Sequence, residues 1–470
     1  MLSFVNGTPV SLEAIPTLAS DAFKSIFTAE DFERDRKRVL ALWKLPDGRL
    51  ACVLGNPATH KLEVCATPAA TYQPLRDEVP ALHRFEAELR GEENLRPFMP
   101  LKGEAAHEVA VGPVHAGVIE PGHFRFQCMG EDVYNLQLFL GSHHRGVEEA
   151  IVKADGNVAR QIALAETCAG DTSIAAATCF AEIMEASNAR RRALPSASAE
   201  GERSASDAAG APRLRDLRLR TLLLELERIA NHVGDLGALA GDVAFLPTAS
   251  FCGRIRGEYL NMTALICGNR FGRNAVVPGG MRCELTEEKR QKLLPWVLAA
   301  KKDLDGALKL MFEAPTVCDR LDGTGVVPKD VAEQLGLVGV ARRASVELNG
   351  DVLSRASVRR MEIEEAHEKV FEILEGKADV ATTANAPDCV PSLDEVRRDF
   401  ACVVATTPAW RGPLVHAALF NTDGRMLRYK IVDPSAHNWQ GLAWALRGEQ
   451  ISNFPICNKS FNLSYCGTDR

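Results

Sequence analysis

The cysteines are the residues in this sequence best suited to metal or redox chemistry, since thiolates hold nickel, zinc and iron–sulfur clusters. There are thirteen, and Cys168 stands directly before "AGDTSIAAATCF", which predicts the start of a helix. Zinc and redox sites usually pair cysteines across a two-residue gap, and the sequence contains no such pair. Most of these cysteines are therefore expected to be reduced core residues, because free cysteine behaves as a small hydrophobe.

A second set of candidates recurs at seven-residue steps: Arg218, Glu225 and His232. This spacing places them on one face of a helix, where a carboxylate and an imidazole could relay protons. An ion-paired structural face explains the same spacing. We favour that simpler interpretation, because structural networks also carry buried charged groups.

The segment that carries these three residues is the most regular predicted helix, with apolar residues repeating every three or four positions through "LRDLRLRTLLLELERIANHVGDLGALAGDVAF". Further helices are predicted over 286–312 and 359–376. Near the C-terminus, "PLVHAALFNTDGRMLRYKIVDP" predicts a hairpin that turns at "NTDG". A helix capped by Ser435 and ending at Gly448 should follow it.

The fold class predicted is α+β, with two domains. Short apolar runs over 37–66 predict a small antiparallel sheet, and "PLRDEVPALHRFEAELRGEENL" predicts a helix, so residues 1–105 form a small α+β domain. Residues 106–470 predict a mainly helical bundle edged by small antiparallel sheets. Within it, 187–213 has almost no large apolar side chains and is expected to be a flexible insertion.

Composition excludes several classes of function. A formal charge of -7 argues against a nucleic-acid partner, which calls for a basic excess. The sequence has no run of about 18 apolar residues, and its N-terminus lacks a basic stretch before an apolar one. We therefore expect a cytoplasmic protein whose membrane contact comes only through partners. Neither a phosphate loop nor a G-x-S-x-G elbow occurs.

Six segments appear in an order that resembles one family: "GPVHAGVIEPGHFRF", "HHRGVEEA", "ELERIANHVGDLGALAGDVAF", "GNRFGRNAVVPGGM", "LVGVARRAS" and "YKIVDPSAHNWQGL". They resemble the large subunit of membrane-associated nickel-iron hydrogenases of the formate hydrogenlyase and hydrogenase-4 type, and the homologous 49 kDa subunit of complex I. The N-terminal unit resembles the complex I 30 kDa subunit. The resemblance covers roughly the whole chain.

This resemblance implies four metal-ligand positions, which the hydrogenases fill with cysteines. Here they fall on Cys168, Asp171, Ser464 and Gly467, so one thiolate of four remains. Cys466 lies one residue away from the last position and would supply at most a second sulfur. Hydroxyl and carboxylate are harder ligands than thiolate, and glycine offers none. We therefore expect Cys168 to be a relic in a chamber without a nickel-iron centre and no metal or cofactor bound by this chain itself.

The resemblance also implies an electron path. Arg125 and His144 match positions near an iron–sulfur cluster that a partner subunit holds, where positive charge stabilises the reduced cluster. Each has a simpler interpretation: Arg125 as a solvated strand-edge residue, His144 as a residue that caps or pairs at a helix start. The histidine that binds quinone in complex I has no clear match, since His115 and His123 are out of register. A quinone or another small acceptor is the expected oxidant.

The function expected from this resemblance is that of an electron-transfer subunit in a membrane-bound, complex I-like or hydrogenase-4-like oxidoreductase, on the cytoplasmic face of the inner membrane. It would form the acceptor chamber beside a small iron–sulfur subunit, with Asp171, Glu225 and His232 delivering protons. Antiporter-like and quinone-module-like membrane subunits are the other expected partners. Two alternatives remain open: an active nickel-iron hydrogenase with unusual ligands, and a non-catalytic subunit that couples the parts of an ion-translocating complex.

Overall fold

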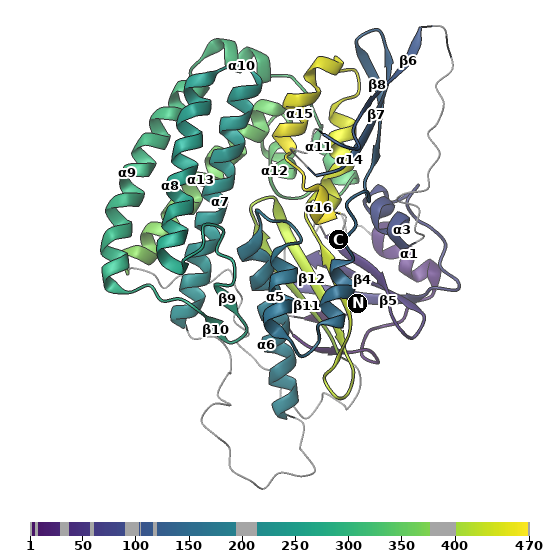
Figure 1. Ribbon diagram of the computed structural model, residues 1–470. Helices are drawn as coiled ribbons and strands as arrows, with labels where there is room; N and C mark the ends of the chain where they lie inside the picture. Colours follow the sequence, from purple (N-terminus) through teal and green to yellow (C-terminus); the bar gives the residue numbers. More distant parts are fainter. Residues whose placement is uncertain are drawn as a thin grey trace.

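Long helices form one side of the computed structural model, and antiparallel sheets lie on the other (Figure 1). This arrangement agrees with the predicted α+β class. The residues that the structure describes are 2–4, 8–28, 37–56, 61–89, 103, 105–115, 120–193, 214–376 and 401–468.

The N-terminal sheet is antiparallel and has the strand order β1-β5-β4-β3. It confirms the small sheet predicted over 37–66. The sheet and the helices beside it comprise β1 (Leu2–Phe4), α1 (Ser20–Thr28), β3 (Arg38–Lys44), β4 (Arg49–Asn56), β5 (Lys61–Pro68), a 3-10 turn (Pro80–Leu82) and α3 (His83–Leu89).

The helix predicted from "PLRDEVPALHRFEAELRGEENL" is shorter than expected. Only α3 is helical, and residues 90–95 lie outside the described part of the chain. The Glu86 carboxylate accepts the backbone N–H groups of Leu75 (2.8 Å) and Arg76 (3.2 Å), which holds this stretch as a turn. Pro80 has no N–H to donate to a helix, so the regular α-helix begins only after it.

The C-terminal sheet has the order β13-β12-β11-β2, and its last strand comes from the N-terminal end of the chain. Its strands are β2 (Val10–Ser11), β11 (Ala401–Ala409), β12 (Gly412–Phe420) and β13 (Met426–Val432). One apolar core includes Phe23 and Leu42 from the N-terminal unit together with Val404 and Leu419 from this sheet. Residues 1–105 and 106–470 thus share a core, and the boundary between them stays a prediction.

The predicted C-terminal hairpin is confirmed. Strands β12 and β13 pair, and the turn between them is closed by hydrogen bonds between Asn421 and both Gly424 and Arg425. The remaining strands are β6 (Ala106–Val111), β7 (His123–Met129) and β8 (Asp132–Phe139), which form a third sheet, and the short pair β9 (Val276–Val277) and β10 (Gly280–Met281).

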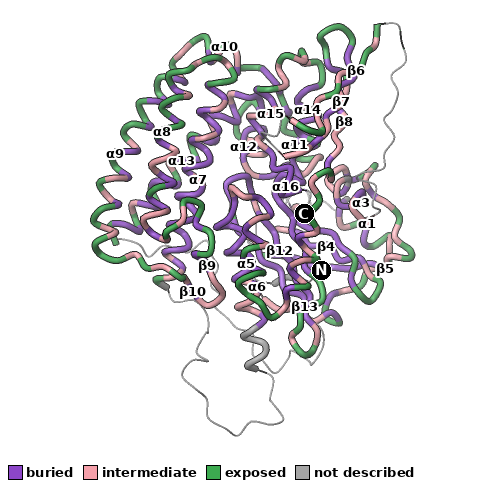
Figure 2. The backbone as a smooth tube through the Cα atoms, viewed as in Figure 1, coloured by how far each residue is buried: buried purple, intermediate pink, exposed green. Residues whose placement is uncertain are grey.

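The helical layer is built around α7, which Figure 2 shows as buried along most of its length. Its apolar stripe packs against neighbouring helices, as the repeat in the sequence predicts. The helices after α3 are α4 (Val147–Lys153), α5 (Val158–Glu166), α6 (Ser173–Ala193), α7 (Leu214–Asp242), α8 (Leu246–Cys267), α9 (Glu287–Phe312), α10 (Pro315–Leu321), α11 (Lys329–Gln334), α12 (Gly339–Glu347), α13 (Val352–Leu374), α14 (Ser435–Ala445), α15 (Phe454–Phe461) and α16 (Tyr465–Thr468), with a 3-10 turn at Ile451–Asn453.

Helix α6 continues to Ala193, so the first part of the predicted insertion 187–213 is helical. Residues 194–213 lie outside the described part of the chain. Helix α13 begins at Val352, seven residues before the predicted start, because the Asp351 carboxylate caps it by accepting the N–H of Ser354 at 2.7 Å.

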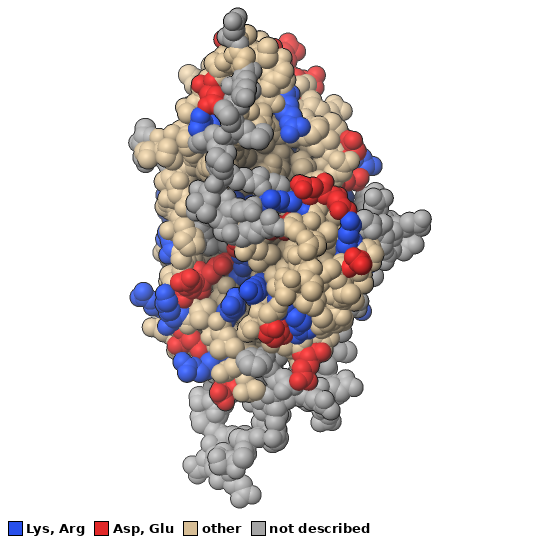
Figure 3. Space-filling model, turned by 90° about the vertical axis from the view of Figure 1, so that its right-hand side faces the viewer, with Lys and Arg blue, Asp and Glu red and all other residues tan. Residues whose placement is uncertain are grey.

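The surface carries both signs of charge. Figure 3 shows Lys and Arg interspersed with Asp and Glu over the described part of the face that it presents. Among the described residues, no helix combines the length and apolar character needed to cross a membrane.

Candidate functional site

Two loops carry the four predicted ligand positions, and the structure brings them to a common neighbour, Arg411. Cys168 and Asp171 lie in the turn between α5 and α6, whereas Ser464 and Gly467 lie at the start of and within α16. Arg411 follows β11 and donates from Nη1 and Nη2 to the two Asp171 oxygens, at 2.8 and 2.7 Å. Its Nε donates at 2.6 Å to the carbonyl of a residue two positions before Ser464.

The Asp171–Arg411 ion pair is bidentate, and it joins a buried guanidinium to a carboxylate that is 34% exposed. Arg411 is 7% exposed and lies over the Trp410 ring at 3.9 Å. Burial by itself raises the pKa of Asp171, but the charge and hydrogen bonds of Arg411 outweigh it and hold that pKa below its ordinary value. The Asp171 backbone carbonyl also accepts from Asn231 Nδ2 (2.8 Å) and Trp410 Nε1 (3.2 Å). Both oxygens of the Asp171 carboxylate are thus bound by the Arg411 guanidinium.

Asp433 is a second carboxylate near Arg411. It is 1% exposed, and its Oδ1 accepts the N–H of Ser435 at 2.8 Å. Burial raises its pKa, and the charge of Arg411 only partly offsets this. The sequence predicted that the Ser435 side chain caps α14, and this prediction is wrong, since the side chain makes no capping bond. Its hydroxyl instead accepts the N–H of Ser464 at 2.8 Å.

The position of Gly467 leaves no space for a thiolate. A Cβ atom at this residue would lie 2.7 Å from Asp433 Oδ2 and 2.8 Å from Ser464 Oγ. The Ser464 hydroxyl is also occupied, since it accepts the N–H of Gly467 at 2.9 Å. The nearby Cys466 thiol lies 3.2 Å from Glu120 Oε1, and burial raises its pKa to about 11. The donors and the space at this end of the site therefore do not fit a four-sulfur nickel-iron centre.

Cys168 itself is a core residue in this structure. Its side chain is 3% exposed, and it belongs to the large apolar core of the helical layer. Arg145 donates at 3.0 Å to its backbone carbonyl and at 2.8 Å to that of Thr167. Across the described part of the chain, no group of three or more His, Cys, Asp and Glu side chains is arranged to hold a metal ion.

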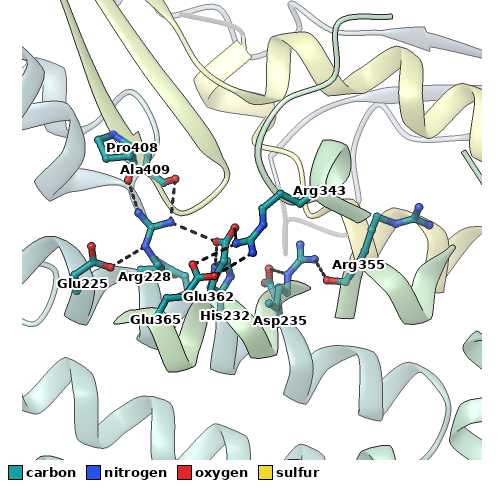
Figure 4. A network of polar contacts seen from close by, with 12 residues as sticks. Glu225, Arg228, His232, Asp235, Arg343, Arg355, Glu362, Glu365, Pro408 and Ala409 are labelled. Atoms are coloured by element: carbon teal, nitrogen blue, oxygen red, sulfur yellow. Dashed lines mark hydrogen bonds and ion pairs between the residues drawn. The ribbon is translucent and has the colours of Figure 1, made fainter. Parts of the chain in front are cut away.

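Glu225 and His232 lie in a second polar network, between α7 and α13 (Figure 4). Glu225 accepts from Arg228 and Lys369, both at 2.9 Å. Burial opposes the ionisation of Glu225, but these two cations lower its pKa below the ordinary value. Arg228 also donates to Pro408 O at 2.5 Å, which ties the network to the end of β11.

Glu362 of α13 is the centre of this network. Its Oε2 lies 2.8 Å from His232 Nε2, and its two oxygens contact Arg228 at 3.4 Å and Arg343 at 3.3 Å. Burial opposes the charge of Glu362, yet His232 and the two arginines lower its pKa to about 2. Burial lowers the pKa of His232. The Trp410 ring lies between this network and the Arg411 pair, 5.9 Å from the His232 ring.

The predicted cluster-facing residues lie on the sheet side. Arg125 of β7 is paired with Glu108. His144 is exposed in the loop before α4, and its backbone N–H donates to Gly141. Their roles near a partner's cluster stay predictions.

Sequence reasoning missed Arg411 and Glu362, which supply charge to these two networks, and also missed Glu227, a buried acid of α7. Arg411 is separated from Asp171 by 240 residues, and Glu362 from His232 by 130, so no local pattern pairs them. Glu227 did leave a signal. It is a carboxylate at a position of α7 that continues the spacing of the buried stripe through Leu223 and Ala230.

Comparison with known proteins agrees with the motifs. Residues 242–348 match the family described as "Respiratory-chain NADH dehydrogenase, 49 Kd subunit". Over 399 residues the chain is 26% identical to hydrogenase-4 component G of Escherichia coli (strain K12), covering 83% of this chain and 66% of that protein. It is 23% identical to formate hydrogenlyase subunit 5 of the same organism, covering 77% of this chain and 63% of that protein.

A third relative comes from respiratory complexes. NADH-quinone oxidoreductase subunit 4 of Thermus thermophilus is 27% identical over 275 residues, which cover 50% of this chain and 67% of that protein. The match to each of the two Escherichia coli proteins thus spans just under two thirds of their length. Together these matches confirm the resemblance: residues 242–348 match the 49 kDa-subunit family, and the chain is similar to hydrogenase-4, formate hydrogenlyase and NADH-quinone oxidoreductase subunits.

Proposed function

We propose that this chain is an electron-transfer subunit of a membrane-associated oxidoreductase of the hydrogenase-4 or complex I type, without a nickel-iron centre. The observation that carries the proposal is the Asp171–Arg411 pair. In this pair, the carboxylate at one former ligand position is bound by a guanidinium. A fixed cation beside the chamber favours the arrival of negative charge, as cationic side chains do near redox centres.

In this proposal the electrons come from an iron–sulfur cluster in a small partner subunit, on the side of Arg125 and His144. The acceptor is a quinone or another small molecule. The protons that the acceptor takes up on reduction come from the buried acids that surround Asp171. Antiporter-like and quinone-module-like subunits would anchor the chain to the cytoplasmic face of the membrane, in keeping with relatives that are named as membrane-bound hydrogenase and NADH-quinone oxidoreductase subunits.

Metal analysis tests the first part of this proposal. The intact complex is purified through a tag on this subunit, and nickel and iron are measured against protein. We expect iron without stoichiometric nickel. Nickel near one per chain, together with hydrogen-dependent dye reduction, would overturn the proposal in favour of a hydrogenase with a new set of ligands.

Substitution of Asp171 tests the second part. In Asp171→Asn the side chain keeps its shape but loses the charge that pairs with Arg411. We expect turnover of the complex to fall about tenfold or more, because asparagine cannot take up and pass on the proton that the proposal assigns to Asp171. Asp303→Asn is the control, since Asp303 forms an exposed pair with Arg254. Subunit content and iron are measured in both, so that failed assembly is separated from lost chemistry.

One observation favours a second function, that of a structural coupling subunit. The two carboxylates of the network, Glu225 and Glu362, are each paired with two arginine or lysine side chains, as in structural ion-pair networks. If the chain only couples its neighbours, Asp171→Asn leaves turnover of the assembled complex unchanged.

A further inference from the structure

Glu227 is a buried acid on the face of α7 that packs against α6, opposite the Glu225 network. It is 8% exposed, and its Oε2 accepts the N–H of Ile174, in the first turn of α6, at 2.8 Å. Its other oxygen, Oε1, is buried and has no hydrogen-bond partner among the described residues. A buried carboxyl oxygen without a partner carries a desolvation cost, so it needs either a proton or a water.

A small cavity adjoins this side chain. Its volume is about 10 Å³, and Glu227 lines it together with Asp171, Thr263, Arg270 and Phe271. That volume is close to what one water molecule requires. Arg270 and Phe271 are exposed, whereas Asp171 is paired with Arg411. The cavity thus lies between exposed residues and the Asp171–Arg411 pair.

The surroundings of Glu227 favour its protonated form. Burial is the largest influence and raises its pKa, and the negative charge of Asp171 raises it further. The backbone N–H groups of Ile174 and Ala175 and the charge of Arg228 act in the opposite direction. The balance brings the pKa of Glu227 to about 8, so near neutrality it is a carboxylic acid that can donate into the cavity.

We propose that Glu227 loads protons into the chamber: it passes its proton to Asp171 through one water in this cavity and regains one from solvent on the Arg270 side. This step rests on the proposed function, because Asp171 accepts a proton only when an arriving electron offsets the charge of Arg411. The O–H bond of Glu227 breaks, and the water gains that proton while giving one of its own to an Asp171 oxygen. Glu227 is then the carboxylate until solvent restores its proton.

Glu227→Gln tests this step, because glutamine keeps the acceptor for Ile174 but carries no exchangeable acid proton. Glu166→Gln is the matched control. Glu166 is also buried, accepts a backbone N–H (from Asn274, 2.6 Å) and has a pKa raised by burial, but it does not line the cavity. Turnover of the intact complex is measured against pH, and infrared titration of the full-length chain follows the protonated carboxyl band.

Wild-type turnover should fall above about pH 8, where Glu227 loses its proton. We expect Glu227→Gln to lower turnover about tenfold or more, as loss of a proton-transfer group does, and to abolish that fall. The infrared band that titrates near that pH should vanish in Glu227→Gln and persist in Glu166→Gln. Glu227→Asp, which keeps an acid one methylene shorter, should recover part of the turnover and retain a titrating band.

Unchanged turnover and pH profile in Glu227→Gln would overturn the proposal, as would an infrared band that survives this substitution. Failure of the proposed function gives a different result. In that case the wild-type complex reduces no acceptor at any pH, while the infrared titration still reports whether Glu227 holds a proton.

Discussion

Two glutamates of α7, only two positions apart, face opposite sides of the helix, and their pKa values are shifted in opposite directions. Glu225 faces α13, where Arg228 and Lys369 both donate to it, and its pKa is lowered. Glu227 faces α6, where a backbone N–H reaches one oxygen and the other has no hydrogen-bond partner among the described residues, and its pKa is raised to about 8. Both are nearly fully buried.

The difference lies in the cations within hydrogen-bonding reach. Desolvation disfavours the charged form of both carboxyls, and at Glu225 two cations at contact distance reverse it. The α13 side of the helix is therefore an ionised and rigid network, whereas the α6 side holds an acid whose proton can exchange near neutral pH. Asp171 belongs to the first kind, since Arg411 reverses its desolvation. Substitutions that change the cations or the acids of each side in turn test this difference.

Among these substitutions, replacing the cation that pairs with Asp171 should cause the largest loss of stability. Arg411→Met leaves Asp171 and the buried Asp433 without their guanidinium. We expect unfolding by urea to show a loss of roughly 3 kcal/mol, at the low end of the cost of breaking a buried pair because Asp171 remains 34% exposed. The control is Arg254→Met, whose pair with Asp303 is half exposed and should contribute no more than about 0.5 kcal/mol. Equal losses in the two variants would contradict this account.

Removing the central acid of the α13 network should cost somewhat less and should be pH-dependent. Glu362→Gln separates His232, Arg228 and Arg343 from their shared carboxylate, at about 2 kcal/mol at pH 7. The folded-state pKa of Glu362 is about 2, below its ordinary 4.5. Its contribution is thus complete above pH 4.5 and is lost as the pH falls toward 2.

Unfolding free energy measured between pH 2 and 7 checks this prediction. The difference between wild type and Glu362→Gln should shrink through that acid window. A difference that stays constant with pH would show that the ionisation of Glu362 does not contribute to stability.

The acid on the α6 side should give the opposite sign. The folded-state pKa of Glu227, about 8, lies above its ordinary 4.5, so its stabilising contribution is complete below pH 4.5 and is lost as the pH rises toward 8. Glu227→Gln stays neutral at every pH. We expect it to match wild type near pH 4.5 and to exceed it increasingly as the pH rises, by about 4 kcal/mol at pH 8. If Glu227→Gln is instead the less stable protein at pH 8, Glu227 is ionised and paired in the fold.

Much of the fold was predictable because it depends on local patterns. The apolar repeat of α7 and the Asn-Thr-Asp-Gly turn between β12 and β13 specify their own structure. The helix after Pro80 was overestimated, because the carboxylate of Glu86 holds the preceding residues in a turn, which is a contact between residues ten or eleven positions apart. The addition of β2 to the C-terminal sheet pairs residues near 10 with residues near 401, and no local signal indicates it.

The candidate site was predictable in its positions but not in its charges. Family motifs placed Asp171 and Ser464 in related positions, and the structure brings both loops to Arg411. The seven-residue spacing of Glu225 and His232 identified the correct helix face. Whether each acid is ionised depends on residues from distant segments, such as Lys369 and Arg343, which only the fold brings into contact.

The two cations that contact Glu225, Arg228 and Lys369, differ in exposure, so removing each in turn should have different effects on stability. Lys369 is 36% exposed, whereas Arg228 is 12% exposed and also bonds Glu362 and the end of β11. Lys369→Met should therefore cost less than about 1 kcal/mol, because solvent already screens that pair and Arg228 keeps Glu225 ionised. Arg228→Met should cost several times more, since it leaves two buried carboxylates short of a cation. Urea unfolding of both variants at pH 7 measures the ratio. Equal costs would mean that Glu225 needs both cations to remain charged, and that one lost contact is enough to give it the character of Glu227.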